Sequence, residues 1–320
     1  MLRYIVKRVL LSLITLWLLA TIVFLMTWSL PSDPARAIYG PMAPEETVAA
    51  FRETVGLNDP LLQQYGRLFK GLATFDFGPS WANMNFTVWE YLSTPLSKTF
   101  KLAVLALAIT TPVSIIAGLV AARYRDRKVD RGIVLTGLAT SSIPEFVTGA
   151  LLAIVVGVKL GWARPVYSSH AEQLSPWGQL QYFILPALSL AIVYFGYIAR
   201  MMRAGTIRAL DSDYVRTASM KGLSESQVMW RHVLRNAIAP TITVMSVQVG
   251  YLVSGIVGVE YVFNYPGFSK TLLEAVSDRD LPVLQVAVIL AALTYMTATL
   301  LADITIAWLN PRVRLEMSNS

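Results

Sequence analysis

The sequence contains no cysteine, only two histidines and few charged residues. Without cysteine there is no disulfide framework, no thiol nucleophile and no cysteine-ligated metal, and His170 and His232 alone are too few for a metal cluster. Charged residues make up 15% of the 320 positions, whereas a soluble domain carries about 25%. Hydrophobic residues make up 55%, and the mean hydropathy is +0.53. This balance predicts an all-α integral membrane protein without a metal site.

Six apolar stretches are long enough to cross a bilayer, whose hydrocarbon core of about 30 Å requires about 20 helical residues. Five of them carry no charge, and the third carries one, Glu145. The stretches are 9–30, 102–122, 133–158, 182–199, 236–259 and 281–302. The sequence therefore predicts six transmembrane helices.

The charges on alternate sides of these stretches indicate an orientation. One set of flanking segments holds 17 Lys/Arg against 7 Asp/Glu, and the other set holds 10 against 12. By the positive-inside rule, both termini and the loop 200–235 are cytoplasmic, and the loop 31–101 is outside. A cleaved signal peptide is the alternative at the N-terminus, because Ala35-Arg36-Ala37 resembles a cleavage site. The uncharged run of 22 residues is too long for that, and its removal would leave five spans.

The predicted organisation has four parts. Residues 1–30 form an N-terminal tail and the first span, and residues 31–101 form an extracytoplasmic insertion. Residues 102–310 form a five-helix core that includes the cytoplasmic loop 200–235, and residues 311–320 form a cytoplasmic tail. Within the insertion, Pro44 and Gly56 bracket one short amphipathic helix, and a second follows Pro60. These helices either contact a partner outside the membrane or pack on the outer ends of the spans.

The cytoplasmic loop contains DYVRTASMKGLSESQVMWRHVLRN, residues 213 to 236, which predicts two short helices around one glycine. Asp211 or Ser212 is the N-cap of the first helix, and Gly222 occupies the left-handed position that ends it. Ser224 and Gln227 form a capping box for the second. Its less polar face consists of Val228, Met229, His232 and Val233.

Three interpretations of this segment are open from the residues alone. A DNA-binding helix-turn-helix is disfavoured, because no third helix is available and the bilayer is close on both sides, so we expect no nucleic-acid partner. A solvated loop explains the positive charge but not the two caps. A docking element for a cytoplasmic protein explains both features.

The segment resembles the cytoplasmic EAA loop of ABC-importer permeases. The matching positions are Arg216-Thr217-Ala218, Gly222 and His232-Val233-Leu234-Arg235. Arg216 replaces the family's first Glu and Arg235 its final Pro, and both departures look like the dipeptide/oligopeptide branch. Further blocks resemble the first permease subunit of peptide importers in the same order: MLRYIVKRVLLSLITL, GLNDPLLQQYGRLFKGLATFDFGPSW, SSIPEFVTG, ILPALSLA, GVEYVFNYPGFSKTLLEAVSDRDLP and NPRVR.

The resemblance implies a type I ABC-importer permease in a bacterial or archaeal cytoplasmic membrane. Its partners would be a second homologous permease, two cytoplasmic ATPases and an extracytoplasmic substrate-binding protein. ATP and Mg²⁺ would bind to the ATPases, and this chain would have no cofactor and no catalytic residue. NYPGFSKT, residues 264–271, lacks the Gly-Lys step of a phosphate-binding loop. The expected ATPase-coupling residues are Tyr214, Arg216, Thr217, Ala218, Lys221, Gly222, Leu223, Ser224, Gln227, Arg231, His232 and Arg235.

A path for a polar solute requires small or polar side chains along one helical face. In the fifth span Thr241, Gln248 and Gly255 recur every seven residues, with Met245 beside them. In the second span Ser114 belongs to a group of small and hydroxyl residues. Helix packing is the alternative for both groups, because it also favours glycine, serine and threonine.

Two acidic residues lie within or near predicted spans. Glu145 is costly in hydrocarbon, so it is either a functional residue or is satisfied by a helix broken at Pro144. Asp303 is expected to pair with a neighbouring subunit or with Arg312 or Arg314 in the tail. A stand-alone, ion-coupled secondary transporter would have to use Glu145 and Asp303, whereas a membrane enzyme has no recognisable set of catalytic residues. Within the permease interpretation, dipeptides, oligopeptides, nickel complexes, glutathione and opine-like compounds remain open as substrates.

Overall fold

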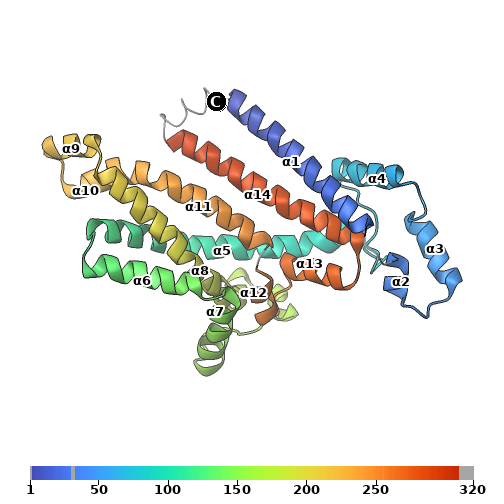
Figure 1. The fold of residues 1–320 in the computed structure, drawn as a ribbon. Helices are drawn as coiled ribbons and strands as arrows, with labels where there is room; N and C mark the ends of the chain where they lie inside the picture. Colours follow the sequence, from blue (N-terminus) through green and yellow to red (C-terminus); the bar gives the residue numbers. More distant parts are fainter. Residues whose placement is uncertain (1, 30–32, 255, 310–320) are drawn as a thin grey trace. The chain divides into compact units, whose positions relative to one another are not determined.

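The computed structural model describes residues 2–29, 33–254 and 256–309, and within these residues the fold is helical, without a strand (Figure 1). An isolated bridge between Pro79 and Thr87 is the one β-type contact recorded there. The α-helices are α1 (Leu2–Trp28), α2 (Pro34–Tyr39), α3 (Glu45–Val55), α4 (Leu61–Thr74), α5 (Val88–Arg123), α6 (Lys128–Ser142), α7 (Glu145–Leu152), α8 (Pro176–Leu210), α9 (Asp213–Met220), α10 (Glu225–Gln227), α11 (Leu234–Ser254), α12 (Val257–Val262), α13 (Phe268–Ser277) and α14 (Leu281–Leu309). Three other segments are the π-helices η1 (Ala153–Lys159) and η3 (Val228–Val233) and the 3-10 helix η2 (Ser169–Gln173).

The apolar helices agree with most of the predicted spans. Within the described residues, α1, α5, α8 and α14 are long and apolar enough to cross a membrane. The predicted third span is a pair instead of one straight helix: α6 and the α7–η1 segment meet at an angle of 96°. The break lies at Ile143 and Pro144, where the sequence predicts a broken helix, because proline disfavours helical backbone at the residue before it. The predicted fifth span corresponds to α11, which is 21 residues long but is not among the four.

The chain divides into two compact units, one of residues 1–10, 100–265 and 294–320, and the other of residues 11–99 and 266–293. In the first unit α8 is the central helix. It packs against α6, α7 and α11, and 61% of its most apolar window is buried. A helix that is apolar on all sides belongs inside a bundle, which explains why α8 lacks one distinct apolar face.

The second unit contains the predicted insertion and confirms its two helices. α3 follows Pro44 and ends at Gly56, whose φ of 68° is left-handed, as the sequence indicates. α4 packs on the C-terminal half of α1, where the Tyr65 hydroxyl lies 2.9 Å from Thr21 Oγ1 and the Tyr65 ring meets Phe24 edge-on. For α4, the alternative of packing on a span is therefore observed.

Asp280 organises the loop that precedes α5. Its carboxylate accepts hydrogen bonds from the Ser80 hydroxyl at 2.5 Å and from the backbone N–H groups of Trp81 and Ala82, each at 3.2 Å. It also accepts the N–H of Val283 at 3.3 Å, in the first turn of α14. Four donors satisfy this buried carboxylate, so its burial is structural.

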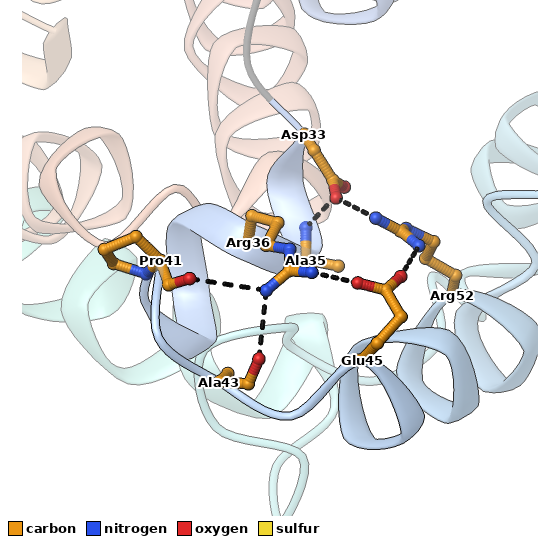
Figure 2. A network of polar contacts seen from close by, with 7 residues as sticks. All are labelled: Asp33, Ala35, Arg36, Pro41, Ala43, Glu45 and Arg52. Carbon is orange, nitrogen blue, oxygen red and sulfur yellow. Dashed lines mark hydrogen bonds and ion pairs between the residues drawn. The ribbon is translucent and has the colours of Figure 1, made fainter.

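Figure 2 shows a chain of alternating charges between α2 and α3. Arg36 pairs with Glu45, Glu45 with Arg52 at 2.9 Å, and Arg52 with Asp33, which also accepts the N–H of Ala35 at 3.1 Å. Burial raises the pKa of Asp33, but these hydrogen bonds and the Arg52 charge outweigh burial, so the pKa lies below its ordinary value. The ionised form of Asp33 therefore stabilises the fold at pH values above the ordinary carboxyl pKa. This stabilisation is lost as the pH falls through the lowered pKa of Asp33.

Candidate functional site

The predicted helix pair of the loop 200–235 follows α8 almost directly. α8 ends at Leu210, and only Asp211 and Ser212 separate it from α9. Ser212 is the N-cap, one of the two residues that the sequence offers for this position. Its hydroxyl donates back to the carbonyl of Ala209 at 2.5 Å instead of accepting an N–H group of α9. The hydroxyl therefore strengthens the junction between the two helices.

Gly222 ends α9 in the predicted left-handed conformation, with φ at 80°. Its N–H donates to Ser219 O at 3.0 Å, and the N–H of Leu223 donates to Ala218 O at 3.4 Å. These two bonds constitute a Schellman motif, which satisfies carbonyl groups at the helix end and fixes the exit direction of the chain. The turn between the two helices is therefore defined by hydrogen bonds.

The second helix starts at the predicted capping box but does not end where a separate short helix would. Ser224 Oγ accepts the N–H of Gln227 at 3.3 Å, and the Gln227 side chain accepts the N–H of Ser224 at 3.0 Å. From there the chain continues from α10 through η3 into α11, with right-handed helical backbone at both junctions. The expectation of a short helix followed by a distinct span is corrected to one helical run.

The buried face of this helix pair, residues 212–235, packs on other helices of its unit. Val228 and Val233 are buried and Met229 and His232 half-buried, which confirms the predicted less polar face. The apolar residues of this face join one cluster with residues of α5, α8, α9 and α11. The cluster consists of Leu119, Met202, Ala209, Val215, Ala218, Val228, Val233 and Ala237.

The outward face of the pair carries most of the predicted coupling residues. Ala218 is buried, and Leu223 and His232 are half-buried, so these three support the element from inside. The exposed ones are Tyr214, Arg216, Thr217, Lys221, Gly222, Ser224, Gln227, Arg231 and Arg235. Four of these carry a positive charge, and Asp213 and Glu225 on the same helix pair are exposed as well.

The predicted pathway residues of α11 lie inside the first unit. Thr241 is buried, with its hydroxyl 3.5 Å from Met202 Sδ on α8, and Met245 is half-buried. Gln248 is 6% exposed, and its amide makes no hydrogen bond to another described residue. Gly255 lies outside the described residues. Because Gln248 places a polar side chain at a position that is only 6% exposed, it is the most informative of these positions.

The residues of the predicted second span face α8. Ser114 is buried, and its hydroxyl donates to Phe195 O at 3.4 Å, while Thr110 donates to Ala191 O at 3.0 Å. A Cβ on Gly118 would lie 2.6 Å from Met202 Cβ. Within this chain these small residues serve close helix packing, and a pathway role for Ser114 stays a prediction.

Glu145 occupies the first position of α7, directly after Pro144, and is half-buried. At a helix N-terminus a carboxylate is favoured by the helix dipole and by the free backbone N–H groups. The break in the span thus gives a physical reason why an acidic residue is tolerated here. A substrate or gating role for Glu145 stays a prediction.

Comparison with known proteins identifies the family. The model of the binding-protein-dependent transport system inner membrane component matches residues 114–315, and the model of the N-terminal part of such components matches residues 1–102. The glutathione transport system permease protein GsiC of Escherichia coli (strain K12) is 35% identical over 314 residues, 98% of this chain and 99% of the relative. GsiC of Shigella dysenteriae serotype 1 (strain Sd197) matches equally well. The chain belongs to the family of binding-protein-dependent transport system inner membrane components.

A solved structure gives a weaker likeness. The crystal structure of an amino acid ABC transporter with histidines has a TM-score of 0.47 at 16% identity and covers 68% of this chain and 92% of that chain. This score is too low to support any statement about the permease. The family assignment therefore rests on the sequence matches alone.

Two exposed apolar side chains of the helix pair escaped the sequence reasoning. Met220 is 75% exposed and Trp230 is 59% exposed, although both are large and apolar. The signal was present, since Trp230 is absent from the predicted less polar face of the second helix, and Met220 is the last residue of α9, next to the turn at Gly222. Exposed aromatic and methionine side chains are typical anchors of protein interfaces.

Asp303 pairs with a residue of the first helix. Its carboxylate lies 2.8 Å from the guanidinium of Arg8, which joins α14 to α1. Arg312 and Arg314 lie outside the described residues, so the expected pairing with them or with a neighbouring subunit stays a prediction. Because Arg8 belongs to α1 and Asp303 to α14, the ion pair connects the first helix to the last.

Proposed function

We propose that the permease forms half of the channel of an ATP-driven importer for di- or oligopeptides. Its partners are a second permease, two cytoplasmic ATPases and a binding protein that delivers the substrate. The observation that supports this proposal most is the helix pair at residues 212–235, whose turn at Gly222 is closed by hydrogen bonds, whose second helix starts at a capping box, and which is continuous with α11. The glutathione named for the relatives is itself a small peptide, which supports the proposed substrate class.

The helix pair is the proposed docking element for an ATPase. Its buried face is fixed on α5 and α8, while Met220 and Trp230 project from the opposite side beside positive charges. An apolar anchor surrounded by a polar rim suits insertion into a groove of another protein. The exposed coupling residues between Tyr214 and Arg235 are proposed to line this contact, and Ala218, Leu223 and His232 are proposed to support it from inside.

Removal of the two anchors is expected to weaken ATPase binding. In the double variant Met220→Ala/Trp230→Ala, we expect the amount of ATPase that co-purifies with the permease to fall at least tenfold, because buried anchors carry most interface energy, about 2 kcal/mol or more each. Phe75→Ala, which removes an equally exposed ring from the other unit, is the control. Equal recovery of ATPase in both variants would show that the helix pair is not the docking site.

The pathway proposal places Thr241, Met245, Gln248, Gly255, Glu145 and Ser114 along the solute path. Gln248→Leu is expected to lower uptake about fivefold or more while assembly and basal ATP hydrolysis stay unchanged, because a buried polar group contributes about 1–3 kcal/mol when it contacts a solute. The measurement is initial uptake into reconstituted vesicles. Gln173→Leu, at an exposed position of η2, serves as the control. Unchanged uptake in the Gln248 variant would assign the residue to packing.

The proposed orientation has both termini and the helix pair in the cytoplasm and the second unit's helices α3 and α4 outside. Single cysteines in this cysteine-free chain test it with an impermeant thiol reagent. Ser226 is exposed and serves for the inner face, but Ser80 is buried against Asp280, so the exposed Asn85 serves for the outer face. We expect Asn85→Cys to react in intact cells and Ser226→Cys only after the membrane is opened. Labelling of both from one side would contradict the orientation.

A further inference from the structure

Asp130 is a buried carboxylate in the first turn of α6 with a bidentate partner on α8. Its side chain is 3% exposed and accepts Arg203 Nε at 2.5 Å and Nη2 at 2.6 Å. The backbone N–H of Asp126 donates to the same carboxylate at 2.9 Å. A guanidinium and a carboxylate that share two hydrogen bonds hold their planes in one relative orientation. The pair therefore fixes the angle as well as the distance between the two helices.

A second fixed contact lies two helical turns along the same seam. Gly137 follows Asp130 by seven residues on α6, and Gly196 precedes Arg203 by seven residues on α8. A Cβ on Gly196 would lie 1.9 Å from Gly137 O, so the two backbones touch at this point. Residues seven apart share one helical face, so the two contacts belong to one antiparallel seam. With two fixed points, α6 and α8 move as one body.

This body connects the docking element to the broken span. On one side, α8 runs unbroken from Arg203 to Leu210 and reaches α9 after two residues, so a displacement of α9 must turn α8. On the other side, α6 ends at Ser142, directly before the 96° bend that places Glu145 at the start of α7. Other ion pairs nearby, such as Arg125 with Asp211 at 3.4 Å, are exposed and screened by water.

We propose that Asp130 and Arg203 are positioning residues for energy coupling, because their bidentate pair makes α6 and α8 one lever between the docking helices and the bend before Glu145. The inference rests on the proposed function, since a lever requires an ATPase that moves α9. The rigid connection between α6 and α8 concerns this chain alone. Energy coupling with an ATPase and the rigidity of α6 and α8 are therefore tested separately.

The first test uses Arg203→Lys, which keeps the positive charge but replaces the planar fork with a single ammonium group. We expect this variant to assemble with its partners and hydrolyse ATP, while the substrate taken up per ATP hydrolysed in reconstituted vesicles falls about fivefold or more. Asp130→Asn, of equal size and without charge, should show the same loss. Arg125→Lys, the same substitution in the exposed pair, should retain the wild-type ratio.

The second test measures the lever without any partner, so it remains informative if the proposed function is wrong. Spin labels on Leu135→Cys in α6 and Ser219→Cys in α9, both exposed, report the distance between these helices in the permease alone, embedded in lipid nanodiscs. We expect a broader distance distribution in Arg203→Lys or Asp130→Asn and an unchanged one in Arg125→Lys.

The outcomes separate positioning from simple stabilisation. A lower uptake ratio together with a broader distance distribution supports the proposal. A wild-type ratio or an unchanged distribution in a folded variant overturns it, as does a loss of uptake that only follows the amount of folded protein. If neither variant folds, the pair is a requirement for folding, and the positioning role is rejected.

Discussion

The Gly222→Val variant is expected to insert and accumulate normally but to lose coupling between ATP hydrolysis and uptake. Gly222 has φ at 80°, and a left-handed conformation costs a β-branched residue about 1–2 kcal/mol or more. No atom lies within 4 Å of the position of an added Cβ, so the cost is conformational and not steric. The chain relieves it by turning the second helix, and the energy is comparable to coupling free energies of about 1–3 kcal/mol. We expect substrate-stimulated hydrolysis in vesicles to fall roughly tenfold.

Gly222→Asn is the matched control for this experiment, because asparagine tolerates the left-handed region. It should retain both ATPase co-purification and substrate-stimulated hydrolysis close to the wild type. If the valine variant is also normal in both measurements, residues 212–235 are not the coupling element. The contrast between the two side chains at one position thus separates backbone strain from simple loss of a glycine.

Gly196→Ala is expected to cause a large loss of stability in the first unit. The added Cβ would lie 1.9 Å from Gly137 O and 2.6 Å from Gly137 C, and these backbone atoms cannot rotate away. Either α6 and α8 separate or one of them bends, at a cost of about 3 kcal/mol, the upper range for overpacking. We expect the purified variant to aggregate at a temperature several degrees lower than the wild type.

Gly132→Ala tests whether that loss comes from the close contact. Gly132 belongs to the same helix α6, but no atom lies within 4 Å of its added Cβ. Alanine is a better helix former than glycine by about 1 kcal/mol, so this variant should be as stable as the wild type or more stable. Equal thermal behaviour of the two alanine variants would mean that α6 and α8 do not touch at Gly196.

The features that the sequence could predict are those set by neighbouring residues. The capping box of Ser224 and Gln227, the left-handed turn at Gly222 and the broken helix at Pro144 each depend on a few consecutive positions and local backbone preferences. The apolar spans could also be predicted, because the hydropathy of a segment depends only on the residues within it. The capping box, the left-handed turn and the broken helix are observed, and so are the spans, except that α11 is not among the helices long and apolar enough to cross a membrane within the described residues.

The features that escaped prediction depend on contacts between distant segments. Asp130 and Arg203 are separated by 73 positions, and nothing in either local pattern indicates the partner. The continuity from α10 through η3 into α11 was missed because polar residues around Asn236 resemble the end of a short helix. The exposure of Met220 and Trp230 was missed because the sequence prediction considered only the less polar face of the second helix and not the apolar residues outside it.

The central claim is that this permease moves its substrate with energy from ATPases that act through residues 212–235. It is tested most directly by uptake of a labelled peptide into vesicles that contain the permease alone, or the permease with a second permease, two ATPases and the binding protein. We expect uptake only when all five subunits are present and ATP is enclosed in the vesicles on the side of the ATPases. We expect a proton or sodium gradient to drive no uptake. Uptake by the permease alone on an ion gradient would contradict the claim and identify a secondary transporter.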